Sequence, residues 1–310
     1  MIIGDLPIYV AEDSVEAWTE RHMFILDDEN KISLVAGVPP DDFSDEGQLW
    51  GNPVYNWGYH MKNSFEWWIK RLKWNFSLFD LVRMDHFRGF DEFWAVKAGS
   101  KNAIDGKWLP ANGKKLFDYA LKEIGNLNII AEDLGVITNT VIELKESYNF
   151  PGMKILQFAF DGNPQNPYLP QNYEENSVAY TGTHDNDTLL GWLKKLNPEA
   201  EDYMRESLKI KETENLEIEE AKEKPEARAE SKAESEDDCP IVYKLIEKLL
   251  QSKSKLTIIP LQDYLCLDSN ARINTPSTLG GNWMWRVKKD QLKTELVQKI
   301  KQMTINSNRI

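Results

Sequence analysis

Short apolar runs rich in β-forming residues alternate along the chain with amphipathic helical patterns, and this alternation limits the fold more than any other feature. The runs predict six strands, at Ile2–Val10, Leu81–Met84, Leu127–Ala131, Met153–Phe160, Ser177–Tyr180 and Lys255–Leu261. Apolar residues three and four positions apart predict helices between them, for example at Ser64–Phe79, Lys114–Ile124 and Thr138–Tyr148. Such alternation is typical of a parallel sheet with right-handed crossovers. The sequence therefore predicts an α/β fold, either an open doubly wound sheet or a barrel.

The placement of acidic residues favours a TIM-type (β/α)8 barrel. An open nucleotide-binding sheet carries a glycine-rich phosphate loop after a strand, and none of the predicted strands is followed by one. Acidic residues instead follow several strands, where barrel enzymes carry their chemistry. A closed barrel of this type has eight strands, and the segment Phe24–Tyr55 is too rich in turn residues to supply the missing pair. We therefore expect an incomplete barrel in which strands 3–8 are present and the first two are missing.

The charge of the chain is unevenly distributed. The net charge is −13, which disfavours nucleic acid or an anionic membrane as a main partner. Between Lys211 and Asp238 there are 12 acidic and 5 basic residues and no aromatic ones, a composition typical of disorder or of a solvated helix. We predict an acidic insert at residues 209–240. It separates barrel strands 3–7, in residues 1–208, from the last helix and strand and a C-terminal helical segment, in residues 241–310.

Cysteine usage and the N-terminal sequence predict a cytoplasmic location. Cys239 and Cys266 are the only two cysteines and have no metal-ligand spacing, so we expect a reducing compartment and no disulfide scaffold. The sequence MIIGDLPIYV lacks a basic segment, a long apolar run and a cleavage site of the signal-peptide kind. No stretch has the roughly 18 apolar residues that a membrane span needs. The four histidines are scattered without zinc-binding spacing, so no metal is expected.

Three acidic motifs each follow a predicted strand. They read LVRMDHFRGF, NIIAEDLG and SVAYTGTHDND, and they place Asp85, Glu132 and Asp185 at strand ends. A single acidic residue at a strand end is more often a cap for the next helix, and Asp133 and Asp187 are candidates for that role. Three such motifs in order, two of them with adjoining His or Arg residues, favour a catalytic site instead.

The neighbours of these carboxyl groups indicate different roles. Arg83 lies on the same strand face as Asp85, and an adjacent cation keeps a carboxylate ionised, as a nucleophile requires. Glu132 follows an apolar run, and a less polar setting raises a carboxyl pKa towards the value useful for a general acid. Asp185 beside His184 could bind sugar hydroxyls. Retaining glycoside chemistry needs two carboxyl groups about 5–5.5 Å apart, which neighbouring barrel strands can supply.

At these residues the chain resembles the α-amylase superfamily, and more narrowly the 4-α-glucanotransferases, also called amylomaltase or disproportionating enzyme. The segments RMDHFRG, AEDLG and THDND carry the broader resemblance. The narrower one rests on longer stretches, which read GDLPIYVAEDSVEAW, VAGVPPDDFSDEGQLWGNPVYNW, IIPLQDYLCL and ARINTPSTLGGNWMWR. The resemblance extends from about Gly4 to Gln291, interrupted by the acidic insert.

The resemblance implies a retaining transferase that moves a segment of an α-1,4-glucan, such as a maltodextrin, to the 4-OH of glucose or another glucan. It implies Asp85 as nucleophile, Glu132 as acid/base and Asp185 as transition-state stabiliser, with Arg83 and His184 as their polar partners. It implies no metal or organic cofactor. The positions that would line the glucan groove are Asp5, Phe43, Trp50, Asn52, Tyr55, Asn274 and Pro276.

The aromatic residues of the long loop also have a physical rationale. A transferase must let a sugar hydroxyl rather than water attack the glycosyl-enzyme, and an aromatic loop can exclude water and stack on sugar rings. Trp57 is expected to pack under the loop rather than contact substrate. Trp67, Trp68 and Trp74 fall at helical spacing and are expected to face the core or the barrel.

Members of the family carry the first two strands and further glucan contacts upstream of the segment that begins here at Met1. We therefore hypothesise a C-terminal fragment of a glucanotransferase, or a chain that needs a partner to supply the remaining strands. In either case the catalytic residues would be present, but we do not expect the isolated chain to be active. Two alternatives remain open. One is an α-glucan hydrolase of the same superfamily, and the other is a non-catalytic glucan-binding fragment.

Overall fold

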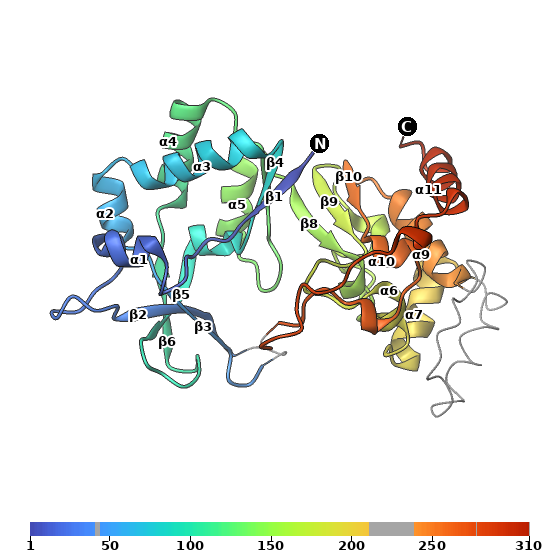
Figure 1. The fold of residues 1–310 in the computed structure, drawn as a ribbon, viewed down its shortest axis with the longest axis horizontal. Coiled ribbons are helices and arrows are strands. Elements are labelled where there is room, and N and C mark those ends of the chain that lie inside the picture. The colour runs from blue at the N-terminus through green and yellow to red at the C-terminus, as the bar shows by residue number, and fades with distance from the viewer. Residues whose placement is uncertain (41–43, 211–238, 277, 310) are drawn as a thin grey trace. The chain divides into compact units, whose positions relative to one another are not determined.

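The computed structural model describes residues 1–40, 44–210, 239–276 and 278–309 (Figure 1). The chain divides into two compact units, Met1–Met153 and Lys154–Ile310. The boundary between the units lies inside the strand Gly152–Ile155. This strand is within residues 1–208, which the sequence predicted to form one continuous run of barrel strands. Most of the predicted acidic insert at 209–240 lies outside the described residues.

A parallel sheet contains all six predicted strands. It has the order β1-β4-β7-β8-β9-β10. Parallel pairing joins β1 to β4 and β4 to β7 in the first unit, and β9 to β10 in the second. The strands are β1 (Ile3–Leu6), β4 (Leu81–Met84), β7 (Ile129–Ala131), β8 (Gly152–Ile155), β9 (Ser177–Tyr180) and β10 (Leu256–Ile258). The α/β class is confirmed, and the parallel sheet is consistent with an incomplete TIM-type barrel.

A second, antiparallel sheet in the first unit was not predicted. Its order is β3-β2-β5-β6. The strands are β2 (Leu34–Val38), β3 (Gln48–Pro53), β5 (Glu92–Lys97) and β6 (Gly106–Pro110). In Figure 1 this sheet lies at the end of the unit opposite to the helices labelled α3 and α4. The turn-rich segment 24–55 thus does contain strands, but they pair in this sheet and not in the parallel one.

The helices of the first unit enclose an aromatic-rich core. They are α1 (Val15–Thr19), α2 (Trp57–Lys62), α3 (Glu66–Leu78), α4 (Gly113–Ile124) and α5 (Asn139–Ser147). Trp57 is buried, which confirms its packing role, and Trp68 is fully buried. Trp74 is 67% exposed, so the expectation that it faces the core was wrong. It follows Trp68 by six residues, which turns it about 240° around the helix and away from the buried face.

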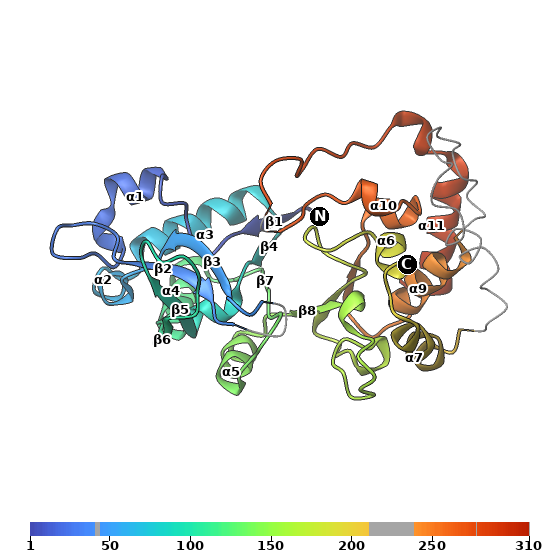
Figure 2. The ribbon, with the colours of Figure 1, turned by 90° about the horizontal axis from the view of Figure 1, so that it is seen from below.

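The second unit has its own apolar core around a central helix. Its helices are α6 (Leu189–Leu193), α7 (Pro198–Leu208), α9 (Pro240–Leu250), α10 (Leu261–Tyr264) and α11 (Thr294–Asn306). Helix α9 buries Leu245, Ile246 and Leu249, and Figure 2 shows α11 near it. Among the described residues, no helix has both the length and the apolar character needed to cross a membrane.

A disulfide joins Cys239 to Cys266, with the two Cα atoms 6.3 Å apart. The sequence gives no hint of this pairing, because the cysteines are 27 residues apart and follow no recognisable framework. The expectation of unpaired cysteines was therefore wrong. Cys239 precedes α9 and Cys266 follows α10, so the bond ties the ends of the α9–β10–α10 segment together.

Candidate active site

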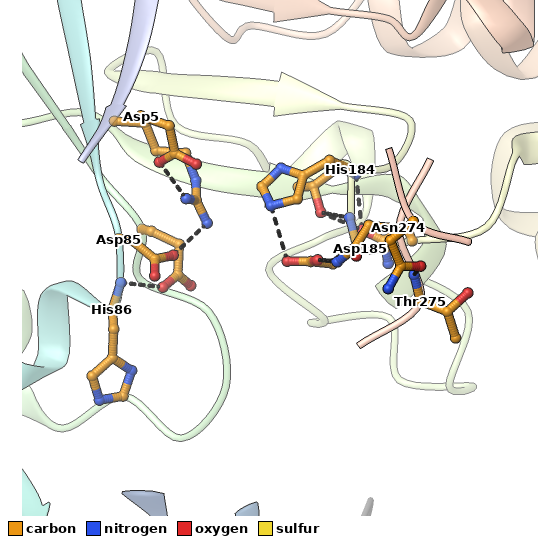
Figure 3. Close-up of polar contacts among 12 residues, drawn as sticks. Asp5, Asp85, His86, His184, Asp185, Asn274 and Thr275 are labelled. Carbon is orange, nitrogen blue, oxygen red and sulfur yellow. Dashed lines mark hydrogen bonds and ion pairs between the residues drawn. The ribbon is translucent and has the colours of Figure 1, made fainter. Parts of the chain in front are cut away.

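The end of β4 carries an ion pair that extends to a neighbouring strand. Arg83 Nη2 lies 2.8 Å from Asp85 Oδ1, and its Nη1 lies 2.7 Å from Asp5 Oδ1 on β1. The two carboxylates point towards the same guanidinium in Figure 3. Burial opposes the charge of Arg83, but Asp85, Asp5 and Glu132 together hold its pKa above its ordinary value. Asp85 therefore lies beside a permanent cation, as the sequence predicted.

Glu132, directly after β7, lies in a different environment. Its Oε2 accepts a hydrogen bond from the main-chain N–H of His86 (2.7 Å), and its Oε1 accepts one from Leu134 N (2.9 Å). Burial, followed by the negative charge of Asp85, raises the pKa of Glu132 to about 8. The carboxyl group is therefore mostly protonated at neutral pH. Two carboxyl groups with unlike environments are what acid and nucleophile roles require.

The residue between these two groups has an unusual backbone. His86 has a φ of +46°, in the left-handed region that non-glycine residues rarely adopt. This conformation lets its N–H point at Glu132 while the chain turns into the 3-10 helix Phe87–Phe90. Burial lowers the pKa of His86 to about 4, so the ring is neutral. Trp50 on β3 packs edge-on against that ring, with 4.8 Å between the ring centroids, and is 37% exposed.

Asp133 is not the helix cap that its position suggested. Its Oδ2 pairs with Lys145 Nζ of α5 at 2.7 Å, and its Oδ1 accepts a hydrogen bond from Met153 N of β8. The residue that precedes α5 is Thr138. Gly152 is required beside this pair, because a Cβ atom there would lie closer to Asp133 Oδ2 than van der Waals contact allows. The buried pair therefore fixes the strand end that carries Glu132.

In the second unit, the segment after β9 carries His184 and Asp185. His184 Nε2 lies 3.2 Å from Asp185 Oδ2. Asn274 Nδ2 donates to Asp185 Oδ1 at 2.6 Å, and Arg272 Nη2 donates to the main-chain oxygen of Asp185 at 2.6 Å. Figure 3 shows the Asn274 side chain directed at Asp185. Of the predicted groove residues, Asn274 is therefore a direct partner of a predicted catalytic residue.

The other predicted groove residues differ in exposure. Asn52 Nδ2 donates to the main-chain oxygen of Val10, and Pro276 is exposed. Tyr55 is 1% exposed and its hydroxyl donates to Ile8 O, which favours packing over substrate contact. Phe43 lies outside the described residues.

Asp187, the other suggested helix cap, is also held by side chains. Its Oδ2 accepts from Lys195 Nζ and from Ser269 Oγ, and its Oδ1 accepts from Thr188 N. Burial favours the protonated form, but Lys195 and Ser269 hold the pKa of Asp187 below its ordinary value. The residue that caps α6 is Thr188, whose hydroxyl accepts from Gly191 N.

Sequence reasoning missed three residues at this site. Arg272 lies in the recognised segment ARINTP, but no pattern linked it to Asp185. Trp283 places its ring 5.3 Å from that of His184, centroid to centroid. Asp263 lies buried just after β10 and bonds to the segment that carries Asp185. The rule that singled out the other acidic residues, an acid just past a strand, would have found Asp263 as well. Within the described part of the chain, no cluster of three or more His, Cys, Asp or Glu residues could hold a metal ion.

The sequence is similar to a known protein family and to several curated relatives. The family described as 4-alpha-glucanotransferase matches residues 1–293. The 4-alpha-glucanotransferase of Clostridium butyricum is 45% identical over 305 residues, which is 98% of this chain and 58% of that protein. The 4-alpha-glucanotransferase of Thermus thermophilus is 42% identical and covers 100% of this chain and 58% of its own length. The chain thus spans just over half the length of these relatives.

The structure of this chain is also similar to solved structures of amylomaltases. The amylomaltase from Streptococcus agalactiae in complex with acarbose superposes with a TM-score of 0.86 at 39% identity, over 99% of this chain and 57% of that one. The amylomaltase from Corynebacterium glutamicum has a TM-score of 0.72 at 18% identity, over 97% of this chain and 46% of that one, and this supports the fold alone. The chain belongs to the 4-alpha-glucanotransferase family.

Proposed function

We propose that this chain carries the catalytic groups of a 4-alpha-glucanotransferase. In this reaction a segment of an α-1,4-glucan passes to the 4-OH of glucose or of another glucan, with retention of the anomeric configuration. The observation that carries the proposal is the contrast between two carboxyl groups. Asp85 is paired with Arg83, whereas the protonated form of Glu132 is favoured by burial and by the charge of Asp85.

Each group has one role in each half of the reaction. Asp85 attacks the anomeric carbon while Glu132 gives its proton to the departing glycosidic oxygen, which leaves a glycosyl ester on Asp85. The 4-OH of the acceptor then gives its proton to the Glu132 carboxylate and attacks the same carbon. The ester bond breaks, and Asp85 returns to its ionised state. The pKa of Glu132 near 8 favours a proton on it at the start of each cycle.

The remaining predicted residues complete the proposal. Asp185, with His184, is proposed to stabilise the oxocarbenium-like transition state, and the bond from Asn274 fixes its carboxylate. Trp50 offers an exposed ring beside His86 on which a sugar could stack. Asp5 is proposed to act mainly through Arg83, since its carboxylate is already bonded to that guanidinium.

The test is product analysis with maltotriose. Transfer predicts glucose and longer maltodextrins at a constant number of reducing ends, whereas a gain of reducing ends would show hydrolysis. Asp85→Asn should abolish the formation of both glucose and longer maltodextrins. A suitable control is Asp80→Asn, which removes an exposed carboxylate at the opposite end of the same strand and should leave the products unchanged.

A second substrate separates the two carboxyl roles. A maltosyl fluoride donor needs little acid assistance, because fluoride is a good leaving group. Glu132→Gln should therefore form the glycosyl-enzyme from the fluoride but not from maltotriose, whereas Asp85→Asn should use neither donor. Acarbose, the compound bound to the Streptococcus agalactiae amylomaltase, serves as a binding probe. Acarbose binding without turnover, unchanged by Asp85→Asn, would contradict the proposal and favour a glucan-binding fragment.

Further predictions from the sequence stay proposals. They are the cytoplasmic location, the division into segments 1–208, 209–240 and 241–310, and a partner chain that supplies additional strands. The partner would be recognised by a change in oligomeric mass together with a gain of transferase activity on mixing.

A further inference from the structure

A buried carboxylate in the second unit lies behind the segment that carries His184 and Asp185. Asp263 belongs to α10, directly after β10, and is 1% exposed. Its Oδ2 accepts a hydrogen bond from Thr181 Oγ1 at 2.5 Å, and its Oδ1 accepts one from Leu189 N at 2.7 Å. Thr181 follows the last residue of β9, and Leu189 is the first residue of α6. One carboxylate therefore holds both ends of the segment 182–188.

The middle of that segment is held by other contacts. Asn186 Oδ1 accepts from both the N–H and the hydroxyl of Thr183. Asp185 is bonded to Arg272 and Asn274, which follow the 3-10 helix Ser269–Ala271. The carboxylate of Asp263 thus sets the distance between the two ends, and the contacts to 272–274 set the direction of Asp185.

The chemistry of the two donors determines what the side chain at this position must provide. A main-chain N–H can only donate, so the atom facing Leu189 must accept. The hydroxyl of Thr181 can donate or accept, because it rotates. Burial raises the pKa of Asp263 to about 6, which still leaves it mainly ionised at neutral pH with both oxygens free to accept.

We propose that Asp263 is a positioning residue for the transferase reaction, which acts by fixing both ends of the 182–188 segment and thereby the place of Asp185 and His184. It does not touch substrate. This inference rests on the proposed function in that Asp185 must take part in the reaction. An unpaired buried donor is costly, so removal of the carboxylate should displace the segment rather than leave it in place.

The conservative variant distinguishes positioning from general stability. In Asp263→Asn the amide oxygen can accept from Leu189 N, and the amide N–H can donate to Thr181 once that hydroxyl turns round. We therefore expect Asp263→Asn to keep the segment in place. Asp263→Ala loses both bonds, and Thr181→Val loses one of them while keeping the shape of the side chain.

The measurement that needs no turnover is the NMR signal of the His184 imidazole. The chain has four histidines, so the signal can be assigned by comparison with His184→Gln. Asp263→Ala and Thr181→Val should shift this signal, and Asp263→Asn should leave it close to the wild-type position. Ser254→Ala is the matched control, because Ser254 bonds to Ser177 at the opposite end of β9 and is also buried. It removes a buried hydrogen bond from the same strand, and it should leave the signal unchanged.

Kinetics provide the second measurement. Misplacing a transition-state stabiliser lowers kcat more than it changes KM, and we expect kcat to fall by about ten- to a hundredfold in Asp263→Ala. Asp263→Asn should restore most of it. If the wild-type chain shows no transfer, even when it is mixed with a chain that supplies the additional strands, the proposed function fails, while the His184 signal still decides the role of Asp263.

Several results would overturn the inference. The first is a His184 signal that does not change in Asp263→Ala. The second is a shift of that signal in Ser254→Ala as large as the shift in Asp263→Ala. The third is a shift in Asp263→Asn as large as the shift in Asp263→Ala. If Asp263→Ala does not fold, Thr181→Val decides the question, and an unmoved signal in that variant counts against positioning.

Discussion

At the scale of single residues, three carboxyl groups show how the same chemical group behaves in different surroundings. The carboxyl group of Asp85 faces a guanidinium, that of Glu132 faces two main-chain N–H groups in a buried position, and that of Asp263 bridges two donors. Burial raises the pKa of Glu132 to about 8 and that of Asp263 to about 6. The sequence pattern identified where the first two acids lie, and their neighbours in space determine what each can do.

Glu132 should make stability depend on pH. Its folded pKa of about 8 lies above the ordinary value of 4.5. The stability that the protonated carboxyl contributes is therefore fully present below about pH 4.5 and is lost as the pH rises through 8. We expect the unfolding free energy of the wild type to fall over this window relative to Glu132→Gln, by up to about 5 kcal/mol.

Urea unfolding of both proteins at several pH values between these limits would measure that difference. Comparing the two proteins at each pH cancels the contribution of the other titrating groups. Parallel curves would contradict the raised pKa.

At the scale of secondary structure elements, one buried ion pair connects three elements of the first unit. Asp133 follows β7, Lys145 lies on α5, and Met153 of β8 donates to the same carboxylate. Both side chains are about nine-tenths buried, with exposures of 9% and 10%. A pair at this depth is costly to break, because the remaining charge is left without a partner.

Lys145→Met should destabilise the chain by about 3–5 kcal/mol, since it leaves the Asp133 carboxylate buried and uncompensated. Lys31→Met is the matched control. Lys31 pairs with Glu29 at the same 2.7 Å distance, but both side chains are exposed. That change should cost less than about 1 kcal/mol. Denaturant unfolding of both variants would check this, and equal costs would show that burial does not matter here.

Helix α3 offers a second comparison within one element. Trp68 is fully buried and Trp74 is 67% exposed, although both tryptophans lie on the same helix. Trp68→Ala should lower the unfolding free energy by about 3–5 kcal/mol. Trp74→Ala should change it by less than about 0.5 kcal/mol. A similar loss in thermal unfolding of both variants would indicate that the exposed face of α3 is covered in solution.

The sequence predicted some elements much better than others. The strands β4 and β9 are continuous apolar runs with turn residues around them, and their bounds agree with the prediction. Strand β3, which reads QLWGNP, contains glycine, asparagine and proline, and it forms because β2 pairs with it. Pairing between distant segments has no local signal. The same holds for the partners of Asp185, since Arg272 and Asn274 are distant from it in sequence.

At the scale of the whole molecule, the two units have separate hydrophobic cores. The core of the first unit contains residues such as Leu72 and Phe117, and that of the second contains residues such as Leu245 and Met204. Each core is built from its own helices. The predicted catalytic residues Asp85 and Glu132 depend on the first core, and Asp185 depends on the second.

Because the two units have separate hydrophobic cores, we expect them to unfold in separate transitions. Calorimetry should show two transitions, because destabilising one core leaves the other packed. Leu72→Ala should lower the midpoint of one transition and Leu245→Ala that of the other, each by the equivalent of about 2–5 kcal/mol. A single transition that both variants shift equally would show that the units unfold as one.

The close approach at Gly152 has a consequence for which substitutions this chain can accept. Any side chain at position 152 would collide with the Asp133 carboxylate, so the glycine can change only after the acid has changed. The acid in turn cannot be lost while Lys145 remains buried beside it. We therefore expect positions 133, 145 and 152 to accept substitutions only in matched combinations. A library that randomises all three at once should yield folded clones in matched combinations, and a library that varies one at a time should return mainly the parent sequence.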